Sequence, residues 1–255
     1  MAKILAVTNQ KGGVGKTTTT VNLAASLAAM KKRVLLVDLD PQGNATMGSG
    51  INKQDLPVSI YHVLLGSNTL AQALRYSEAG EYDVLPSNQA LAGAEIEMVD
   101  LPQREVRLKN ALQAVADEYD YILIDCPPAL NLLTVNGLCA ADSVMIPTQC
   151  EYYALEGLSD LVNTIRKVRA HLNANLEIEG LLRTMFDPRN ALAQQVSEQL
   201  QRHFGDKVYR TVIPRNIRLA EAPSFGVPVL HHDKTSKGSQ AYLALAGELL
   251  NNASV

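Results

Sequence analysis

The chain has 255 residues, of which 47% are hydrophobic and 19% charged, and its formal net charge at pH 7 is −3. This length suffices for a compact domain with a sizeable core, and no repeat, low-complexity run or polar linker divides residues 1–255, so we expect a single domain. The small negative charge argues against a protein that binds nucleic acid over its whole surface.

Short apolar runs alternate with helical patterns from the first residues onward. The opening run, from Met1 to Val7, is too short for a signal peptide and is expected to be a core strand. The predicted strands cover residues 4–7, 33–37, 82–85, 121–124, 144–147, 178–182 and 211–213. Helical spacing occurs at residues 17–30, 105–118, 155–171 and 191–204. This alternation predicts an α/β fold of three layers, with a mostly parallel sheet and helices on both faces.

A glycine-rich segment follows the first strand, with the sequence K-G-G-V-G-K-T-T from Lys11 to Thr18. A strand, such a turn and a helix in succession direct backbone N–H groups and the positive end of the helix dipole at a volume suited to phosphates. Gln10 stands where the standard phosphate loop has its first glycine, and Lys11 adds a second lysine. A glycine-rich turn that binds nothing is the alternative.

Acidic residues follow two other predicted strands. The segment V-D-L-D-P-Q-G-N places Asp38 and Asp40 just after a buried strand, and Y-I-L-I-D-C-P-P ends an apolar strand in Asp125. Ligands of such folds bind beyond the carboxyl ends of the strands, where these segments and the glycine-rich loop converge. Carboxylate and hydroxyl oxygens suit Mg²⁺, and such constellations serve phosphoryl transfer. Solvated turns are the alternative for both segments.

These motifs resemble the deviant Walker A signature of the ParA/MinD family of P-loop ATPases. Further segments, at residues 42–46, 185–190 and 213–228, extend the resemblance to the ParA side of the family over essentially the whole chain. It implies an ATPase with slow turnover, in which a homodimer holds ATP between its subunits.

The resemblance also implies roles for individual residues. Lys16 stabilises the phosphates of its own nucleotide, Lys11 reaches the nucleotide of the partner subunit, and Asp40 orients the attacking water. Mg²⁺ is held by Thr17, by Asp125 through water and by Asp38 in its outer shell. The residues expected to bind ATP or ADP are Lys11, Gly12, Gly13, Val14, Gly15, Lys16, Thr17, Thr18, Met185, Pro214 and Asn216.

The charge of the chain is unevenly distributed. Residues 183–218 contain seven basic residues against three acidic ones, which could form a basic stripe in a dimer. The resemblance implies that Arg189, Arg215 and Arg218 contact double-stranded DNA without sequence preference. It also implies a ParB-type partner that stimulates hydrolysis, a cytoplasmic, nucleoid-associated protein, and a role in chromosome or plasmid partitioning. Solvated helix faces are the alternative for the basic residues.

Other functions remain as alternatives. A MinD-like ATPase has a basic amphipathic helix at its C-terminus, whereas no Lys or Arg follows Lys237 here, so we expect no membrane binding. The three cysteines, Cys126, Cys139 and Cys150, form no metal-binding pattern and are expected to be reduced. A switch that positions another cargo, and a clamp that binds ATP without useful turnover, stay open.

Overall fold

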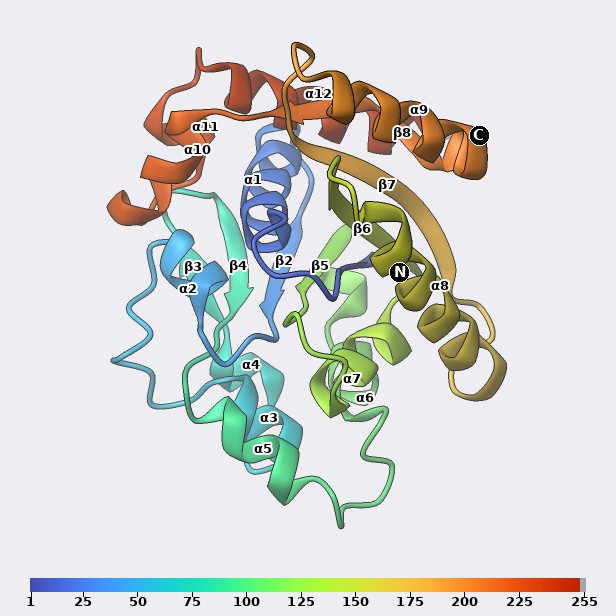
Figure 1. Ribbon diagram of the computed structural model, residues 1–255. Coiled ribbons are helices and arrows are strands. Elements are labelled where there is room, and N and C mark those ends of the chain that lie inside the picture. The colour runs from blue at the N-terminus through green and yellow to red at the C-terminus, as the bar shows by residue number, and fades with distance from the viewer. Residues whose placement is uncertain (253–255) are drawn as a thin grey trace.

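An eight-stranded sheet forms the middle layer of the computed structural model, which describes residues 1–252 (Figure 1). Within these residues the strand order is β3-β4-β2-β5-β1-β6-β7-β8, and all neighbouring strands are parallel except β3 and β4. The predicted mostly parallel sheet is therefore confirmed. The strands are β1 (Lys3–Val7), β2 (Val34–Asp38), β3 (Arg75–Ser77), β4 (Tyr82–Leu85), β5 (Tyr121–Asp125), β6 (Ser143–Gln149), β7 (Glu177–Phe186) and β8 (Val208–Pro214).

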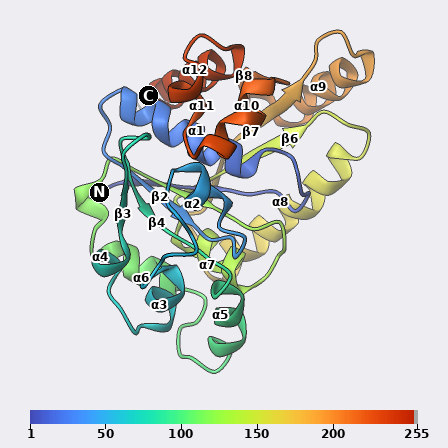
Figure 2. The same cartoon turned by 90° about the vertical axis from the view of Figure 1, so that its left-hand side faces the viewer.

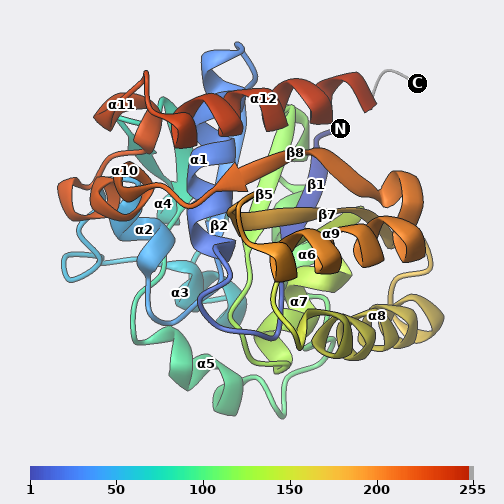
Figure 3. The same cartoon turned by 45° about the horizontal axis from the view of Figure 1, so that its top comes forward.

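Helices pack on both faces of the sheet, as Figures 2 and 3 show from two further directions. Successive residues of one strand belong to different apolar clusters, Leu35 to one and Leu36 to the other. One face carries α3 (Ile60–Leu65), α4 (Leu70–Ala73), α5 (Leu91–Glu97), α6 (Arg107–Gln113), α7 (Leu132–Ala140), α8 (Ala154–His171) and α9 (Ala191–Phe204). The other carries α1 (Lys16–Ala29), α2 (Asn44–Gly48), α10 (Ile217–Glu221), α11 (Val229–His232) and α12 (Lys237–Asn252).

The three central strands end side by side. The register pairs Asp125 with Val7 on one side and with Asp38 on the other. Every residue of β2 and β5 is buried, because helices cover both faces, and this explains their nearly continuous apolar sequences. Only the last residue of each of these two strands is charged, so two carboxylates come together at the same edge of the sheet.

A buried arginine holds the irregular pairing of β7 with β8. Arg183 is 6% exposed, and the register between the two strands shifts on either side of it. Its Nη2 donates to the carbonyl of Tyr209 at 2.7 Å, and its Nη1 donates to Ser197 Oγ at 2.9 Å. The guanidinium thus satisfies a carbonyl where the strands separate. Arg183 was counted in the predicted basic stripe, and that count is wrong because its charge lies inside the fold.

All predicted strands coincide with observed ones, although β6, β7 and β8 are longer than predicted and β3 was not predicted. The predicted helix at residues 105–118 is wrong in its length, because α6 ends at Gln113 and Ala116–Glu118 form a separate 3-10 turn, η1. The buried Val115 lies between them, and the carbonyl of Ala116 accepts a hydrogen bond from the N–H of Ala2. The chain turns there to meet the N-terminal strand.

The three cysteines are buried and free in the structure, as expected. Among residues 1–252, no helix has both the length and the apolar character needed to cross a membrane. Most of the C-terminal segment without basic residues forms α12, while its last three residues, 253–255, lie outside the described part of the chain.

The packing at Gly180 in β7 predicts a sensitive position. A Cβ there would lie 2.6 Å from the ring of Tyr209 and 3.0 Å from the carbonyl of Lys207. We expect Gly180→Ala to lower the free energy of unfolding by about 1–3 kcal/mol, the usual effect of overpacking, in urea denaturation. Gly157→Ala is the control, because its Cβ would meet no atom within 4 Å on an exposed helix position. Equal stability of the two variants would contradict the expected crowding.

Candidate active site

The loop between β1 and α1 has the conformation of a phosphate cradle. Gly13 and Gly15 have φ angles of 74° and 88°, in the left-handed region that favours glycine. Gly15 directly precedes α1, and no side chain caps the helix there. The first N–H groups of α1 are therefore available to an anion, with the positive end of the helix dipole behind them.

Asn9 fixes the start of this loop. It is 7% exposed, its Nδ2 donates to the carbonyl of Pro147 in β6 at 2.8 Å, and its Oδ1 accepts from the N–H of Lys11 at 3.0 Å. The loop is thereby attached to the neighbouring strand just before its first lysine. Sequence analysis did not identify Asn9. An amide side chain directly after a buried strand was the available signal.

A cleft of about 530 Å³ opens beside the loop. The predicted site residues that line it are Gly12, Gly13, Gly15, Lys16, Thr17, Thr18, Asp40, Met185, Pro214, Arg215 and Asn216. Six predicted site residues are not among those that line it, namely Lys11, Val14, Asp38, Asp125, Arg189 and Arg218. The structure thus brings residues from the loop after β1 and from α1, β7 and β8 to one cleft, although they lie up to about 200 positions apart in the chain.

Lys16 lies at the floor of the cleft. It is 7% exposed, and its Nζ donates to the carbonyl of Lys11 at 3.0 Å. Burial lowers the pKa of Lys16, and the carboxylate of Asp125 opposes this effect. Its ammonium group is thus held against the glycine-rich loop, where phosphate oxygens would lie.

The two carboxylates at the strand ends are completely buried and lie next to each other. Oδ2 of Asp125 accepts from Thr17 Oγ1 at 2.7 Å, and Oδ2 of Asp38 accepts from the N–H and hydroxyl of Thr46 at 2.8 and 2.7 Å. Burial raises the pKa of both groups, and Asp38 further raises that of Asp125 by repulsion. Such a pair favours a cation nearby.

The donor set beside the cleft fits Mg²⁺. Thr17 offers a hydroxyl and Asp125 a carboxylate, and hard oxygen ligands of this kind, completed by water, are those that Mg²⁺ prefers. Asp38 is differently placed, because Thr46 occupies one of its oxygens and the N–H of Asp40 donates to the other at 3.2 Å. Asp38 therefore holds the loop that carries Asp40, and its outer-shell role stays a prediction.

Asp40 is the carboxylate that faces the cleft. It is partly buried, and its Oδ1 accepts from the N–H of Gln42 at 2.9 Å. Its backbone carbonyl accepts from Ser87 Oγ at 2.8 Å, so the loop is attached to the chain after β4. The second oxygen of Asp40 has no hydrogen bond within the described residues and can bind water in the cleft.

Lys11 does not line its own cleft. Its Nζ lies 2.5 Å from Oε2 of Glu151, which follows β6, and both side chains are 46% exposed. The lysine is therefore on the surface beside the cleft. This position agrees with a residue that acts on another subunit, and Glu151 is a second residue that sequence analysis did not identify.

Residues at the C-terminal ends of β7 and β8 line another side of the cleft. Met185 has a φ of 48°, an unusual angle for a residue other than glycine, and it lies at the end of β7. Pro214 and Asn216 follow at the end of β8. The Oδ1 of Asn216 accepts from the N–H of Arg218 at 3.1 Å and caps α10. The walls next to these residues could hold an adenine ring.

Two of the predicted DNA-binding arginines, Arg189 and Arg215, interact with the carboxylate of Asp187. Arg189 donates from Nη2 to Asp187 at 2.8 Å, and this hydrogen bond is the main reason why the pKa of Asp187 falls to about 2. Arg215 lowers the same pKa more weakly through its charge. No ion pair of Arg215 occurs within residues 1–252, and its side chain is exposed. Among the three candidate arginines, its positive charge is therefore the least neutralised by neighbouring carboxylates.

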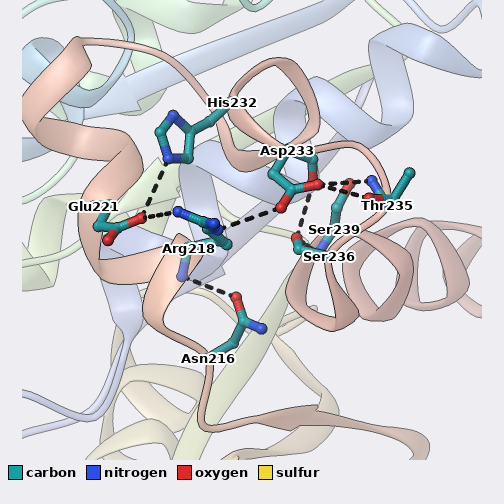
Figure 4. A network of polar contacts seen from close by, with 8 residues as sticks. All are labelled: Asn216, Arg218, Glu221, His232, Asp233, Thr235, Ser236 and Ser239. Atoms are coloured by element: carbon teal, nitrogen blue, oxygen red, sulfur yellow. Dashed lines mark hydrogen bonds and ion pairs between the residues drawn. The ribbon is translucent and has the colours of Figure 1, made fainter.

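Arg218 belongs to a separate polar network, shown in Figure 4. Its Nη1 lies 2.8 Å from Glu221 and its Nε lies 3.3 Å from Asp233. His232 also contacts Glu221 at 3.5 Å and stacks on Phe225. Two carboxylates thus compete with any external anion for Arg218, and the surface is less basic than the sequence indicated.

Comparison with known proteins supplies the context for this cleft. A family model described as an AAA domain matches residues 2–178. The sporulation initiation inhibitor protein Soj of Bacillus subtilis is 58% identical over 99% of this chain and 100% of its own length. The chromosome partitioning protein ParA of Caulobacter vibrioides is 51% identical over 98% of this chain and 94% of its own length.

Solved structures show the same fold. Cobyrinic acid a,c-diamide synthase from Mycobacterium smegmatis, with a bound ATP analogue and magnesium, is 38% identical and superposes with a TM-score of 0.88, covering 100% of this chain and 96% of its own. The septum site-determining protein MinD from Pyrococcus horikoshii OT3, complexed with Mg-ADP, is 26% identical with a TM-score of 0.81, covering 99% and 98%.

The relatives cover nearly the whole chain at high identity, and the cleft is lined by the phosphate loop, with the hydroxyl of Thr17 joining it to the buried Asp125. The chain therefore belongs to the ParA/Soj family of chromosome-partitioning P-loop ATPases.

Proposed function

We propose that this protein is a DNA-segregation ATPase that binds DNA as an ATP-bound dimer and is released when it hydrolyses ATP. One observation carries the proposal. Thr17, in the first turn of the helix that faces the phosphate site, donates directly to the buried Asp125, so the phosphate cradle and the carboxylate of the metal site meet at a single hydroxyl. This arrangement suits a nucleotide triphosphate bound with Mg²⁺.

The residues of the cleft divide the chemistry between them. Lys16 and the N–H groups of the loop would bind the phosphates, and Thr17 and Asp125 would hold Mg²⁺, which would supply positive charge beside the phosphate oxygens. Asp40 uses its free oxygen to orient water toward the γ-phosphate. Because no stronger base faces the cleft among the described residues, we expect slow intrinsic turnover.

The position of Lys11 supports a dimer as the active form. Its ammonium group is paired with Glu151 outside its own cleft, so it is available to a second copy that approaches this face. In that copy it would add positive charge at the γ-phosphate. The dimer would thus form with ATP and separate after hydrolysis.

Double-stranded DNA is the proposed binding partner of the dimer, and a ParB-type protein is the proposed activator of hydrolysis. Several relatives are named as chromosome-partitioning proteins. Arg215 is exposed, while Arg189 and Arg218 can bind phosphate only in competition with their own carboxylates. Contacts of this type make affinity independent of sequence and sensitive to salt. The protein would then reside in the cytoplasm on the nucleoid.

A switch of the MinD type, or one that positions another cargo, is the alternative. It shares the same fold and nucleotide chemistry, as the structure of Pyrococcus MinD illustrates. DNA binding that requires ATP separates the two.

The open space at Gly12 allows a test of the dimer. A Cβ at Gly12 would meet no atom within 4 Å of its own chain. We therefore expect Gly12→Val to fold and to bind ATP, but not to dimerise, because the valine would collide with a second copy at the cleft. Sedimentation velocity with a non-hydrolysable ATP analogue measures this. Gly247→Val, at an equally open position in α12, should dimerise normally. A dimeric Gly12→Val protein would contradict the proposed interface.

The competition at Arg218 predicts opposite effects of two substitutions on DNA affinity. Arg218→Ala should weaken ATP-dependent binding to nonspecific duplex DNA and reduce the salt slope by about one. Glu221→Gln should strengthen binding by about twofold to fivefold, because it removes one carboxylate that competes with DNA phosphates.

Fluorescence anisotropy across a range of salt, with ATP and with ADP, measures both effects. Arg33→Ala is the control, because Arg33 is also exposed and paired, with Asp120, at the opposite end of the sheet. Binding that is equal with ATP and ADP, or that Arg33→Ala weakens as much as Arg218→Ala does, would contradict the DNA proposal.

A further inference from the structure

The phosphate loop is attached to the sheet at a second point, far from it in sequence. Thr184 is the third residue from the C-terminal end of β7 and is 2% exposed. Its Oγ1 donates to the carbonyl of Val14 at 2.7 Å. The two residues are 170 positions apart. The Thr184 methyl group also approaches the position of a Cβ on Gly15 to 3.7 Å. This side chain therefore packs against the glycine-rich turn, and Thr184 and Gly15 both line the cleft.

The hydrogen bond determines how one peptide group of the loop is oriented. In a trans peptide the C=O and the following N–H point in opposite directions, and the structure contains no cis peptide among its described residues. Because Thr184 holds the carbonyl of Val14, the N–H of Gly15 points away from the Thr184 hydroxyl. No hydrogen bond within the described residues occupies this N–H, and Gly15 lines the cleft, so the group is free for a ligand there.

The flexibility of Gly15 explains why the hydrogen bond from Thr184 to Val14 is needed. Gly15 has a φ of 88°, and glycine has more accessible backbone conformations than any other residue, so the peptide before it can rotate unless something holds it. No side chain caps α1 at this position. The carbonyl of Val14 has its hydrogen bond from a buried hydroxyl, which solvent cannot easily replace.

We infer that Thr184 is a positioning residue for phosphate binding, because it orients the N–H of Gly15 toward the phosphates. The inference rests on the proposed nucleotide site. It assigns to β7 a role in phosphate recognition that is separate from any contact with the base. The neighbouring Met185, which lines the cleft from the same strand end, would act on the base side instead.

Two substitutions isolate the hydroxyl group. Thr184→Val keeps the shape of the side chain and removes the donor, whereas Thr184→Ser keeps the donor. We expect Thr184→Val to raise the dissociation constants of Mg-ATP and Mg-ADP by about fivefold to tenfold, the factor that corresponds to one hydrogen bond. Thr184→Ser should stay within about twofold of the wild type. Thr148→Val is the control, because Thr148 is equally buried but bonds only within β6.

Inorganic tripolyphosphate distinguishes phosphate positioning from other effects. Thr184→Val should weaken tripolyphosphate, measured by competition with a fluorescent ATP analogue, by the same factor as ATP. Unchanged affinity, a loss confined to ligands with adenine, or failure of Thr184→Ser to retain binding would overturn the inference. Thermal unfolding without ligand monitors the fold, and Thr184→Ala replaces Thr184→Val if the latter does not fold. A wild-type protein that binds neither ligand would instead contradict the nucleotide site itself.

Discussion

The buried carboxylate pair at the ends of β2 and β5 is the constraint on which the site depends. Asp38 and Asp125 are neighbours in the register of two fully buried strands, so neither can move away from the other. The fold satisfies them with hydroxyl groups, from Thr46 on one side and from Thr17 on the other. These bonds fix the loop that carries Asp40 and the first turn of α1, so the same charges that favour a metal ion also hold Asp40 and the glycine-rich loop in place.

The second feature that shapes the function is the separation of the two lysines. Lys16 is buried against the glycine-rich loop, whereas Lys11 lies on the surface with Glu151. Only one of the two lysines of the glycine-rich loop, Lys16, lines the cleft. The cleft therefore lacks one of the positive charges that this loop could offer to a triphosphate. Completion by a second copy would link hydrolysis to assembly, and the arginines near the ends of β7 and β8 would then act in pairs on DNA.

Much of this arrangement could be predicted from sequence, and the limits have physical causes. Buried parallel strands have nearly continuous apolar sequences, so β1, β2 and β5 and the residues at their ends were predicted correctly. The family resemblance is likewise confirmed by the relatives. Long-range polar contacts leave no periodic pattern, which is why Asn9 and Thr184 were not identified. Nor can a count of charges reveal pairing or burial, and this explains why the basic stripe was overestimated at Arg183 and Arg218.

The central claim is that each active site requires a lysine from a second copy, and mixing two inactive variants tests it most directly. Lys11→Ala has an intact cleft but no lysine to offer, while Asp40→Ala offers Lys11 but cannot orient water. Each variant alone should release phosphate at a small fraction of the wild-type rate. An equal mixture should regain activity up to about a quarter of that rate, because about half of the dimers are mixed and one of the two sites in each mixed dimer is complete. A mixture no more active than its components, while both variants still dimerise with ATP, would contradict the account.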